Sequence, residues 1–311
     1  MSFVEIEQVV KRYGGSISID HLSLTIRQGE IFGLLGPNGA GKSTTINMLC
    51  GLLDIDQGSI RVDGISIREQ PLEVKKRIGL VPQDLAIYER LTARENVAFF
   101  ARLYGLRGSL LHERVDEALA FVGLSDRQHE RPGAYSGGMK RRLNIACAIA
   151  HRPKLIILDE PTVGIDPQSR NHILESVRQL NRMGSTIIYT SHYMEEVAAL
   201  STRIGILDKG HLIAHGTQED LRAQVSQEER LLIQTVHLSE AAMAELRAHP
   251  RIRRLVDTAG GLELFVPPGQ APLQDVLFIL SKHDVGIQAL TRVEPDLEAL
   301  FLSLTGRTLR D

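Results

Sequence analysis

This chain of 311 residues has almost no excess of positive or negative charge. Its 36 Lys and Arg almost balance its 38 Asp and Glu, so the formal net charge is −2. This balance gives no general reason to expect nucleic acid or an acidic membrane surface as a partner. The basic clusters at residues 140–142 and 251–254 are therefore interpreted as solvated faces of helices or strands. No nucleic-acid partner is predicted.

Cysteine and long apolar runs are also scarce. The two cysteines, Cys50 and Cys147, fit no metal-ligand spacing. Both lie in apolar, helix-like stretches, which is typical of small core residues kept reduced in the cytoplasm. No run approaches the ~18 to 20 apolar residues that span a bilayer, and Met1–Glu5 lacks the charged start and apolar core of a secretion signal. Any role at a membrane is therefore expected to depend on a partner protein.

The composition that remains is that of an ordinary soluble protein, with 43% hydrophobic and 24% charged residues. The length is sufficient for two domains, each with its own core. We predict an α/β domain at residues 1–218, with a mostly helical part at about 86–150, and a smaller α+β domain at 219–311. The elements expected in the smaller domain are strand 231–236, helix 241–248, strands 253–256 and 262–266, helix 273–282, strand 286–290 and helix 297–304.

The segment Gly36–Thr44 carries the most informative signal, because it fits G-x-x-x-x-G-K-[ST], the loop that binds nucleotide phosphates. The strand-like Glu30–Leu35 before it and the helix-like Thr44–Cys50 after it supply the context that this loop requires. Its glycines let the backbone curl around an anion, and its N–H groups then point at the phosphates. Lys42 adds a positive charge, and the Ser43 hydroxyl is placed to bind Mg²⁺. We therefore predict that the protein binds a nucleoside triphosphate.

An apolar strand, Leu155–Leu158, ends in the carboxylates of Asp159 and Glu160. A strand buried on both faces brings its carboxyl end to the crevice where α/β sheets bind ligands. Asp159 is then positioned to hold Mg²⁺, directly or through water, and Glu160 to orient and deprotonate an attacking water. Alone, such a pair is more typical of a helix cap or a solvated turn. Because Asp159 and Glu160 follow a phosphate loop and a fully apolar strand in the same chain, a catalytic role for this pair is favoured.

Three further sequence features are weak indications of a functional site when each is taken alone. Ser136–Gly138 opens a helix and offers a second anion site, although the same residues are typical of a turn and N-cap. His192 follows a strand-like segment and precedes a helix, where a lone histidine is usually structural. Gln83 also follows a strand and by itself indicates nothing.

The order of these features resembles the ATPase subunit of ABC transporters over roughly residues 1–220. Their occurrence in this order in one chain makes the resemblance highly specific. The matching segments are a Walker A loop at Gly36–Thr44, a Q-loop glutamine at Gln83, a signature at Tyr135–Met139, a Walker B strand at Leu155–Glu160, a D-loop at Gly164–Asp166 and a switch histidine at His192, with Tyr13 at the place of the aromatic residue that stacks on adenine.

The resemblance implies a P-loop core in which a parallel sheet is joined by an antiparallel β subdomain and a helical insertion. It also implies ATP and Mg²⁺ as cofactors. In this family two subunits sandwich two ATP molecules head to tail, and closure of the dimer drives a membrane-spanning permease. The chain would then be a peripheral subunit at the cytoplasmic face of the cell membrane, and a homodimer is more economical than pairing with a related ATPase chain.

For individual residues, the resemblance implies that Glu160 is the catalytic base and that His192 and Gln83 assist it. Mg²⁺ would be held by Ser43, Gln83 and Asp159. The residues expected to contact ATP are Tyr13, Gly36, Pro37, Asn38, Gly39, Ala40, Gly41, Lys42, Ser43 and Thr44, together with Ser136, Gly137, Gly138 and Asp166, of which the signature residues would face the other subunit's nucleotide.

Two motifs depart from the common family pattern. In the signature, Tyr135 and Met139 stand where Leu and Gln are common, and Met139 cannot supply the polar contact that Gln makes to the opposite nucleotide. The D-loop segment reads Gly164–Pro167 where S-A-L-D is common, but Asp166 is retained. The signature variant is similar to that of a branch of bacterial drug and antibiotic exporters.

The segment Glu294–Arg307 resembles the tail of those exporter ATPases. An amphipathic helix that packs within its own domain explains the segment equally well, as does a dimerising role. A further interpretation makes the C-terminal domain a ligand-sensing regulator of the ATPase.

The sequence therefore predicts an ATP-hydrolysing subunit of an exporter for a drug, antibiotic or other small molecule. One alternative is a soluble ABC ATPase that acts on ribosomes or chromosomes. Such proteins usually carry two cassettes or a long coiled coil, whereas this chain has one Walker A loop and no sustained heptads. A second alternative is an importer ATPase, against which the signature variant and the tail argue. The transported molecule is not encoded here, because the membrane subunits form its path.

Overall fold

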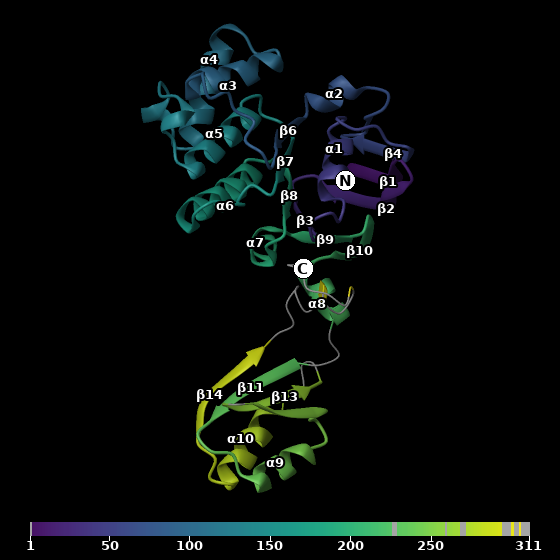
Figure 1. Cartoon of the computed structure of the whole chain (residues 1–311), viewed down its shortest axis with the longest axis vertical. Helices are drawn as coiled ribbons and strands as arrows, with labels where there is room; N and C mark the ends of the chain where they lie inside the picture. The colour runs from purple at the N-terminus through teal and green to yellow at the C-terminus, as the bar shows by residue number, and fades with distance from the viewer. Residues whose placement is uncertain are drawn as a thin grey trace. The chain divides into compact units, whose positions relative to one another are not determined.

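A six-stranded sheet occupies the centre of the N-terminal part of the computed structural model (Figure 1). Its strands, in order across the sheet, are β10 (His211–Gly216), β9 (Arg203–Asp208), β3 (Ile31–Leu35), β8 (Thr186–Ser191), β7 (Leu155–Asp159) and β6 (Ile78–Val81). Neighbouring strands run parallel, except that β10 is antiparallel to β9. Every residue of β3 and β7 is buried. Burial on both faces explains why these strands are nearly unbroken apolar runs in the sequence.

The order of the strands places three of their carboxyl ends side by side. β8 lies between β3 and β7 and is parallel to both. The chain leaves β3 into the phosphate loop, β7 into Glu160 and β8 into His192. Parallel neighbours end at the same edge of a sheet, so these three segments meet there although they are far apart in sequence.

A second sheet, wholly antiparallel, contains β2 (Ser16–Arg27), β1 (Ser2–Tyr13), β4 (Gln57–Val62) and β5 (Ile65–Ser66), in that order. Its buried residues share one hydrophobic core with Phe32 and Ile157 of the parallel sheet and with Ile46 and Met48 of α1 (Lys42–Leu49). The antiparallel β subdomain that was predicted beside a parallel core is therefore present. β1 and β2 extend beyond the alternating apolar stretches at residues 4–10 and 22–26 of the sequence, because their ends pair with each other outside these stretches.

The predicted helical part contains α3 (Ala93–Leu103), α4 (Gly108–Phe121) and α5 (Gly137–Ile149), which contact one another. Thr92 begins α3 with a reciprocal cap, in which its hydroxyl accepts from the Glu95 amide and the Glu95 carboxylate accepts from the Thr92 amide. The chain turns at Gly105, which has a φ of +87° just after α3 ends. The next helix, α4, begins at Gly108.

Three further helices complete this part of the chain: α2 (Pro71–Lys75), α6 (Pro167–Arg182) and α7 (Met194–Leu200). α6 buries Ile173, Val177 and Leu180, as their spacing predicts. The short elements α2 and β5 were not predicted, because five and two residues are too few to show a period. Cys50 and Cys147 are free and buried, and burial raises the pKa of Cys50 to about 12, in keeping with inert core residues.

The C-terminal part is a separate four-stranded antiparallel sheet with two helices on one face (Figure 1). Its buried residues form a core of their own, in which Leu231 and Leu264 of the sheet pack with Leu246 and Leu280 of the helices. The predicted α+β arrangement is therefore confirmed. Its elements are α8 (Gln218–Val225), β11 (Glu229–Thr235), α9 (Glu240–Arg247), β12 (Arg254–Thr258), β13 (Gly261–Val266), α10 (Leu273–Lys282) and β14 (Ile287–Val293), with the sheet order β12-β13-β11-β14.

The structure describes residues 2–225, 229–258, 260–267, 272–293, 300, 301 and 305. The chain divides into two units, of which the first holds Met1–Gln218 and the second Glu219–Thr308. Apart from residues 300, 301 and 305, the segment Glu294–Arg307 and the helix predicted at 297–304 lie outside the described residues. Across the described ranges, no helix combines the length and the apolar character needed to cross a membrane.

Candidate active site

The phosphate loop between β3 and α1 is shaped for an anion. Gly41 has a φ of +106°, and a Cβ there would meet Ile19 Cδ1 at 2.5 Å, so only glycine fits this bend. Gly39 has a φ of +79° and faces open space. The Thr45 amide donates to the Gly41 carbonyl at 2.9 Å. The amides of residues 42–44 precede it and have no acceptor within the helix, which leaves them available to phosphate oxygens.

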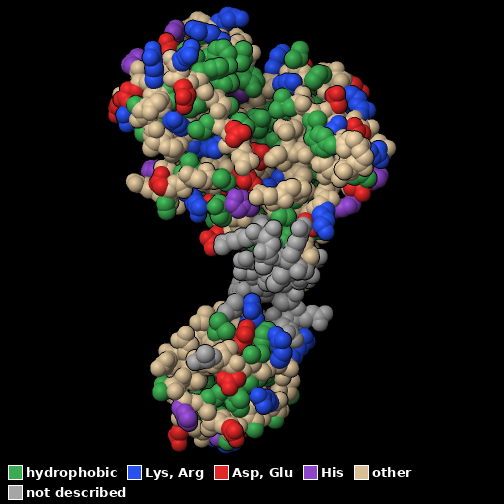
Figure 2. Space-filling model, in the orientation of Figure 1, with side chains coloured by type: hydrophobic (Ala, Val, Ile, Leu, Met, Phe, Trp, Pro, Cys, Tyr) green, Lys and Arg blue, Asp and Glu red, His purple; other side chains and the backbone are tan. Residues whose placement is uncertain are grey.

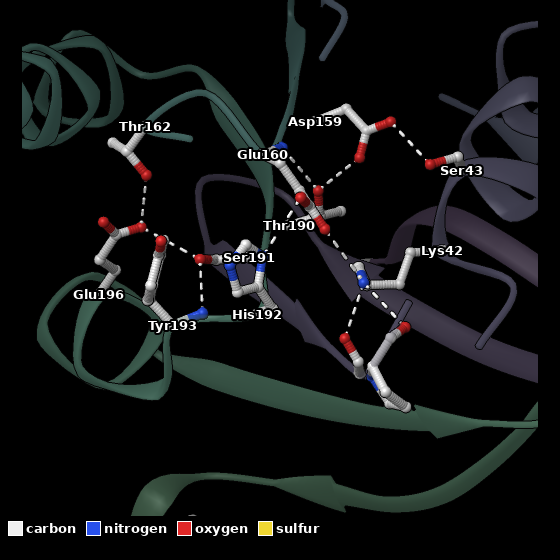
Figure 3. Close-up of polar contacts among 12 residues, drawn as sticks. Lys42, Ser43, Asp159, Glu160, Thr162, Thr190, Ser191, His192, Tyr193 and Glu196 are labelled. Carbon is white, nitrogen blue, oxygen red and sulfur yellow. Dashed lines mark hydrogen bonds and ion pairs between the residues drawn. The ribbon is translucent and has the colours of Figure 1, made fainter. Parts of the chain in front are cut away.

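Lys42 links this loop to the carboxylate at the end of β7 (Figure 3). Its ammonium donates to the carbonyls of Gly36 at 2.7 Å and Pro37 at 3.1 Å. It also forms an ion pair with Glu160, with 3.1 Å between Nζ and Oε1. Both side chains are buried, with relative exposures of 5% and 6%. A phosphate group entering the loop therefore competes with Glu160 for the same cation.

Glu160 contacts His192 through its other carboxylate oxygen. The distance from Oε2 to His192 Nδ1 is 3.3 Å. Glu160 has a φ of +46°, which is uncommon for a residue with a side chain. Its amide donates to both the carbonyl and the hydroxyl of Thr190, at 3.2 and 2.9 Å. These bonds from the neighbouring strand hold the strained turn that directs Glu160 toward Lys42 and His192.

Ser43 and Asp159 form the second polar pair of the site (Figure 3). The Ser43 hydroxyl donates to Asp159 Oδ2 at 3.0 Å, and the Thr190 hydroxyl donates to Asp159 Oδ1 at 2.6 Å. Among the described residues, no group of three or more His, Cys, Asp or Glu side chains is placed to hold a metal. One hydroxyl with one carboxylate is nevertheless the donor set that suits Mg²⁺, which keeps several waters and takes further oxygens from substrate phosphates.

Ser136, Gly137 and Gly138 lie at the start of α5, which Figure 1 shows well separated from α1. Ser136 caps α5 by accepting from the Met139 amide at 3.3 Å, and both Ser136 and Gly137 are exposed. Gly138 is buried, and a Cβ there would lie 2.1 Å from Ser169 Oγ in α6. Close packing of α5 on α6 thus requires this glycine, independently of any nucleotide contact.

The two unusual signature residues both pack near Arg127. The Tyr135 hydroxyl donates to the Arg127 carbonyl at 2.6 Å, and burial raises the pKa of Tyr135, which keeps this hydroxyl protonated. Met139 Sδ lies 3.7 Å from an Arg127 amino group. The Tyr and Met therefore support the preceding loop rather than reaching toward the exposed Ser136.

Gln83 lies two residues beyond β6, and its side chain is exposed. No described hydrogen bond joins that side chain to Ser43, Asp159 or Glu160, and its predicted role stays a prediction. Its backbone is held instead by Arg141 of α5, whose guanidinium donates to the Pro82 carbonyl at 2.7 Å and the Gln83 carbonyl at 2.6 Å.

Arg141→Met is expected to lower the free energy of unfolding by about 2 kcal/mol, because it removes two charge-assisted bonds from a buried side chain. Urea unfolding measures this loss. Lys140→Met is the matched control, since Lys140 contacts only the exposed Glu89 among its described ion pairs and should change stability by less than about 0.5 kcal/mol. Equal effects of the two substitutions would contradict the assigned role of Arg141.

Asp166 and Tyr13 lie outside the Lys42–Glu160–His192 cluster. Asp166 caps α6 by accepting from the Ser169 amide at 2.9 Å, and this bond lowers the pKa of its carboxyl. Tyr13 ends β1 and is 52% exposed. It lies on the β1–β2 hairpin, which touches the phosphate loop where the Ser18 and Thr44 hydroxyls are 3.3 Å apart. An exposed ring on this hairpin remains free to stack on a base.

The structure thus brings together Lys42, Ser43, Asp159, Glu160 and His192, whereas no described contact joins Gln83, Ser136 or Asp166 to this cluster. The sequence did not predict the role of Thr190, which holds the turn at Glu160, or that of Arg141, which holds the backbone at Pro82 and Gln83. A threonine within a buried strand carries no signal of its own, and Arg141 lies in a basic cluster that was interpreted as solvated.

Comparison with known protein sequences identifies relatives of the whole chain. A family model described as ABC transporter matches residues 19–163. The linearmycin resistance ATP-binding protein LnrL of Bacillus subtilis (strain 168) is 46% identical, and the match covers 99% of this chain and 100% of that protein. The daunorubicin/doxorubicin resistance ATP-binding protein DrrA of Streptomyces peucetius is 36% identical, with coverages of 99% and 94%.

Solved structures resemble about 70% of the chain. An ATP-binding subunit of an ABC transporter superposes with a TM-score of 0.66 at 30% identity, covering 71% of this chain and 92% of that one. A dimeric ATP-binding cassette in a post-hydrolysis state with ADP and Pi gives 0.63 at 26% identity, with coverages of 69% and 98%. The predicted family, fold class and ATPase activity are therefore confirmed. This chain belongs to the ABC transporter family and is an ATP-binding, ATP-hydrolysing subunit of an ABC transporter.

Proposed function

We propose that this subunit powers the export of an antibiotic or a related toxic small molecule through a separate membrane permease. The observation that carries this proposal is the full-length similarity to LnrL, a protein named for linearmycin resistance, at 46% identity. The similarity to DrrA, named for daunorubicin/doxorubicin resistance, supports the same direction of transport. Resistance by transport requires outward movement, so the importer alternative and the ribosomal or chromosomal alternative are both less favoured.

In the proposed reaction the phosphate loop and Lys42 bind the ATP phosphates, and Ser43 and Asp159 hold Mg²⁺. When bound, Mg²⁺ would neutralise charge on the phosphate oxygens. Phosphate entering the loop draws the Lys42 ammonium away from Glu160, 3.1 Å distant in this structure. The released Glu160 carboxylate then accepts a proton from the attacking water. His192, 3.3 Å from Glu160, is placed to stabilise the γ-phosphate as charge develops on it.

We assign Ser136 and Gly137 to a second copy's nucleotide rather than to the ATP bound by Lys42 of the same chain. Both residues are exposed at the N-terminus of α5, and α5 lies apart from the phosphate loop (Figure 1). A homodimer arranged head to tail would bring each α5 start to the other copy's phosphate loop. One solved structure that resembles this fold is a dimer.

The proposed permease contact lies on the helical part of the first unit, which would place the chain at the cytoplasmic face of the membrane. Tyr88 and Leu103 are 50% and 67% exposed, and Tyr88 packs edge-on against Phe99 with ring centroids 4.9 Å apart. Figure 2 shows hydrophobic side chains gathered over the region of α3 at the top of the molecule. A patch of exposed apolar side chains is typical of a site where another protein binds.

A pull-down tests this function. Glu160→Gln should bind Mg-ATP, remain in the closed dimer and retain its permease in gentle detergent. Mass spectrometry of the material from native membranes should then find a polytopic membrane protein at stoichiometric yield. Lys42→Ala, handled identically, is the control with strongly weakened ATP binding. Recovery of only ribosomal, chromosomal or other soluble proteins would overturn the transport proposal while leaving the ATPase chemistry intact.

A further inference from the structure

Glu196, in α7, is a buried carboxylate that accepts three hydrogen bonds on one oxygen. Its relative exposure is 3%. The hydroxyls of Thr162, Tyr189 and Ser191 donate to its Oε2 atom at 2.8, 2.8 and 3.1 Å. Burial, and then the nearby carboxylate, raise the pKa of Tyr189, so its hydroxyl remains a donor. Three donors to one oxygen hold this end of the Glu196 side chain in position.

Two of the three donors lead directly to the proposed catalytic pair. Thr162 is two residues after Glu160 in the segment that leaves β7. Ser191 immediately precedes His192, and its hydroxyl also accepts from the Tyr193 amide at 2.9 Å. The residues on both sides of His192 are thus joined through Ser191 to Glu196, as Figure 3 shows. Tyr189 differs from the other two donors in its place, because it lies within β8 and its side chain has no described contact with Glu160 or His192, although its hydroxyl lies 3.5 Å from Thr162 Oγ1.

The second oxygen of Glu196 faces α6. Arg170 Nε lies 3.1 Å from Glu196 Oε1, and the Arg170 guanidinium lies over the Tyr193 ring at 4.9 Å. Arg170 is in the first turn of α6, which Asp166 caps. One buried carboxylate therefore contacts the segment after Glu160, the segment around His192 and the helix that follows the D-loop.

We propose that Glu196 is a positioning residue that sets the spacing between Glu160 and His192 and ties this spacing to α6. The inference rests on the proposed roles of Glu160 and His192. If Glu196 acts in this way, loosening its contact to Thr162 displaces Glu160 relative to the water and the γ-phosphate. The phosphate loop and Lys42 are untouched, so ATP should still bind. A displacement of about 1 Å is enough to cost a large rate factor in a preorganised site.

Two isosteric substitutions separate positioning from structural support, because each deletes one donor to the same oxygen. Thr162→Val should lower kcat for ATP hydrolysis about tenfold while the Kd for ATP changes less than about twofold. Thr162→Val and Tyr189→Phe should lower the melting temperature by similar amounts. Tyr189→Phe should nevertheless leave kcat within about twofold of the unsubstituted protein. Thr162→Ser, which keeps the hydroxyl, should restore kcat.

Equal losses of kcat in Thr162→Val and Tyr189→Phe would overturn the proposal, because Glu196 would then support only the fold. A loss in Thr162→Ser as large as in Thr162→Val would also overturn it, since the methyl group and not the hydroxyl would matter. Glu160→Gln, measured in the same series, separates the role of Glu160 as the base from the role of Glu196 as a positioning residue. If Glu160→Gln keeps its turnover, the proposed base is wrong; if it is inactive while Thr162→Val is fully active, only the role of Glu196 is wrong.

Discussion

Glu160→Gln should lower kcat for ATP hydrolysis by about 10²- to 10³-fold without weakening ATP binding. The substitution keeps the shape of the side chain but removes the group that accepts the proton of the attacking water. It also removes the carboxylate that holds Lys42 at 3.1 Å, so the lysine no longer has to be drawn from an ion pair when phosphate enters. ATP affinity is therefore expected to stay equal or to rise. Steady-state phosphate release and a fluorescent-nucleotide titration measure the two quantities.

Glu195→Gln is the matched control for this experiment. Glu195 carries the same charge and lies on α7 close in sequence to His192, but its side chain is exposed. It should leave both kcat and ATP affinity unchanged. Near-normal hydrolysis by Glu160→Gln would rule out Glu160 as the base. A rise in the Kd for ATP of more than about threefold would contradict the competition between phosphate and Glu160 for Lys42.

Lys42→Ala should raise the Kd for ATP by about 100-fold, because it removes a buried cation that phosphate would otherwise meet in the loop. The structure predicts a second effect as well. Without Lys42, the buried Glu160 loses its ion-pair partner and the Gly36 and Pro37 carbonyls lose a donor. Leaving one member of a buried ion pair uncompensated costs about 3 kcal/mol of stability. Nucleotide titration and urea unfolding measure the two effects separately.

The double variant Lys42→Ala/Glu160→Gln separates these effects. Neutralising Glu160 should restore part of the lost stability, whereas ATP affinity should stay low. Lys76→Ala, which breaks only an exposed pair with Glu73, should change neither quantity. ATP binding by Lys42→Ala at the affinity of the unsubstituted protein would mean that the phosphate loop does not hold the nucleotide.

Local patterns predicted most of the elements that surround the site. The glycines and Lys42 of the phosphate loop, the apolar β7 and the amphipathic α6 each carry their signal within a few residues. Elements without such a signal were missed, as with the two-residue β5. Arg141 was misread for a related reason, because a basic side chain that donates to distant carbonyls has the same local pattern as a solvated one.

Contacts between distant segments decided the geometry of the site. The sequence predicted Lys42, Asp159, Glu160 and His192 as separate motifs, and their convergence depends on the order in which β3, β8 and β7 pair. The support of Glu160 by Thr190 spans 30 residues, and the bond from Thr162 to Glu196 spans 34. No local period records such contacts, because they exist only after the sheet has formed.

The sequence by itself determined the ligand and the family, since a phosphate loop binds through its own backbone and its chemistry is complete within nine residues, Gly36–Thr44. Only the tertiary structure decided that Lys42 is held by Glu160, that Gly138 serves packing against Ser169, and that Glu196 joins the segments of the proposed catalytic pair. The physical reason is that a backbone cradle is local, whereas the burial of a charge depends on every segment that surrounds it.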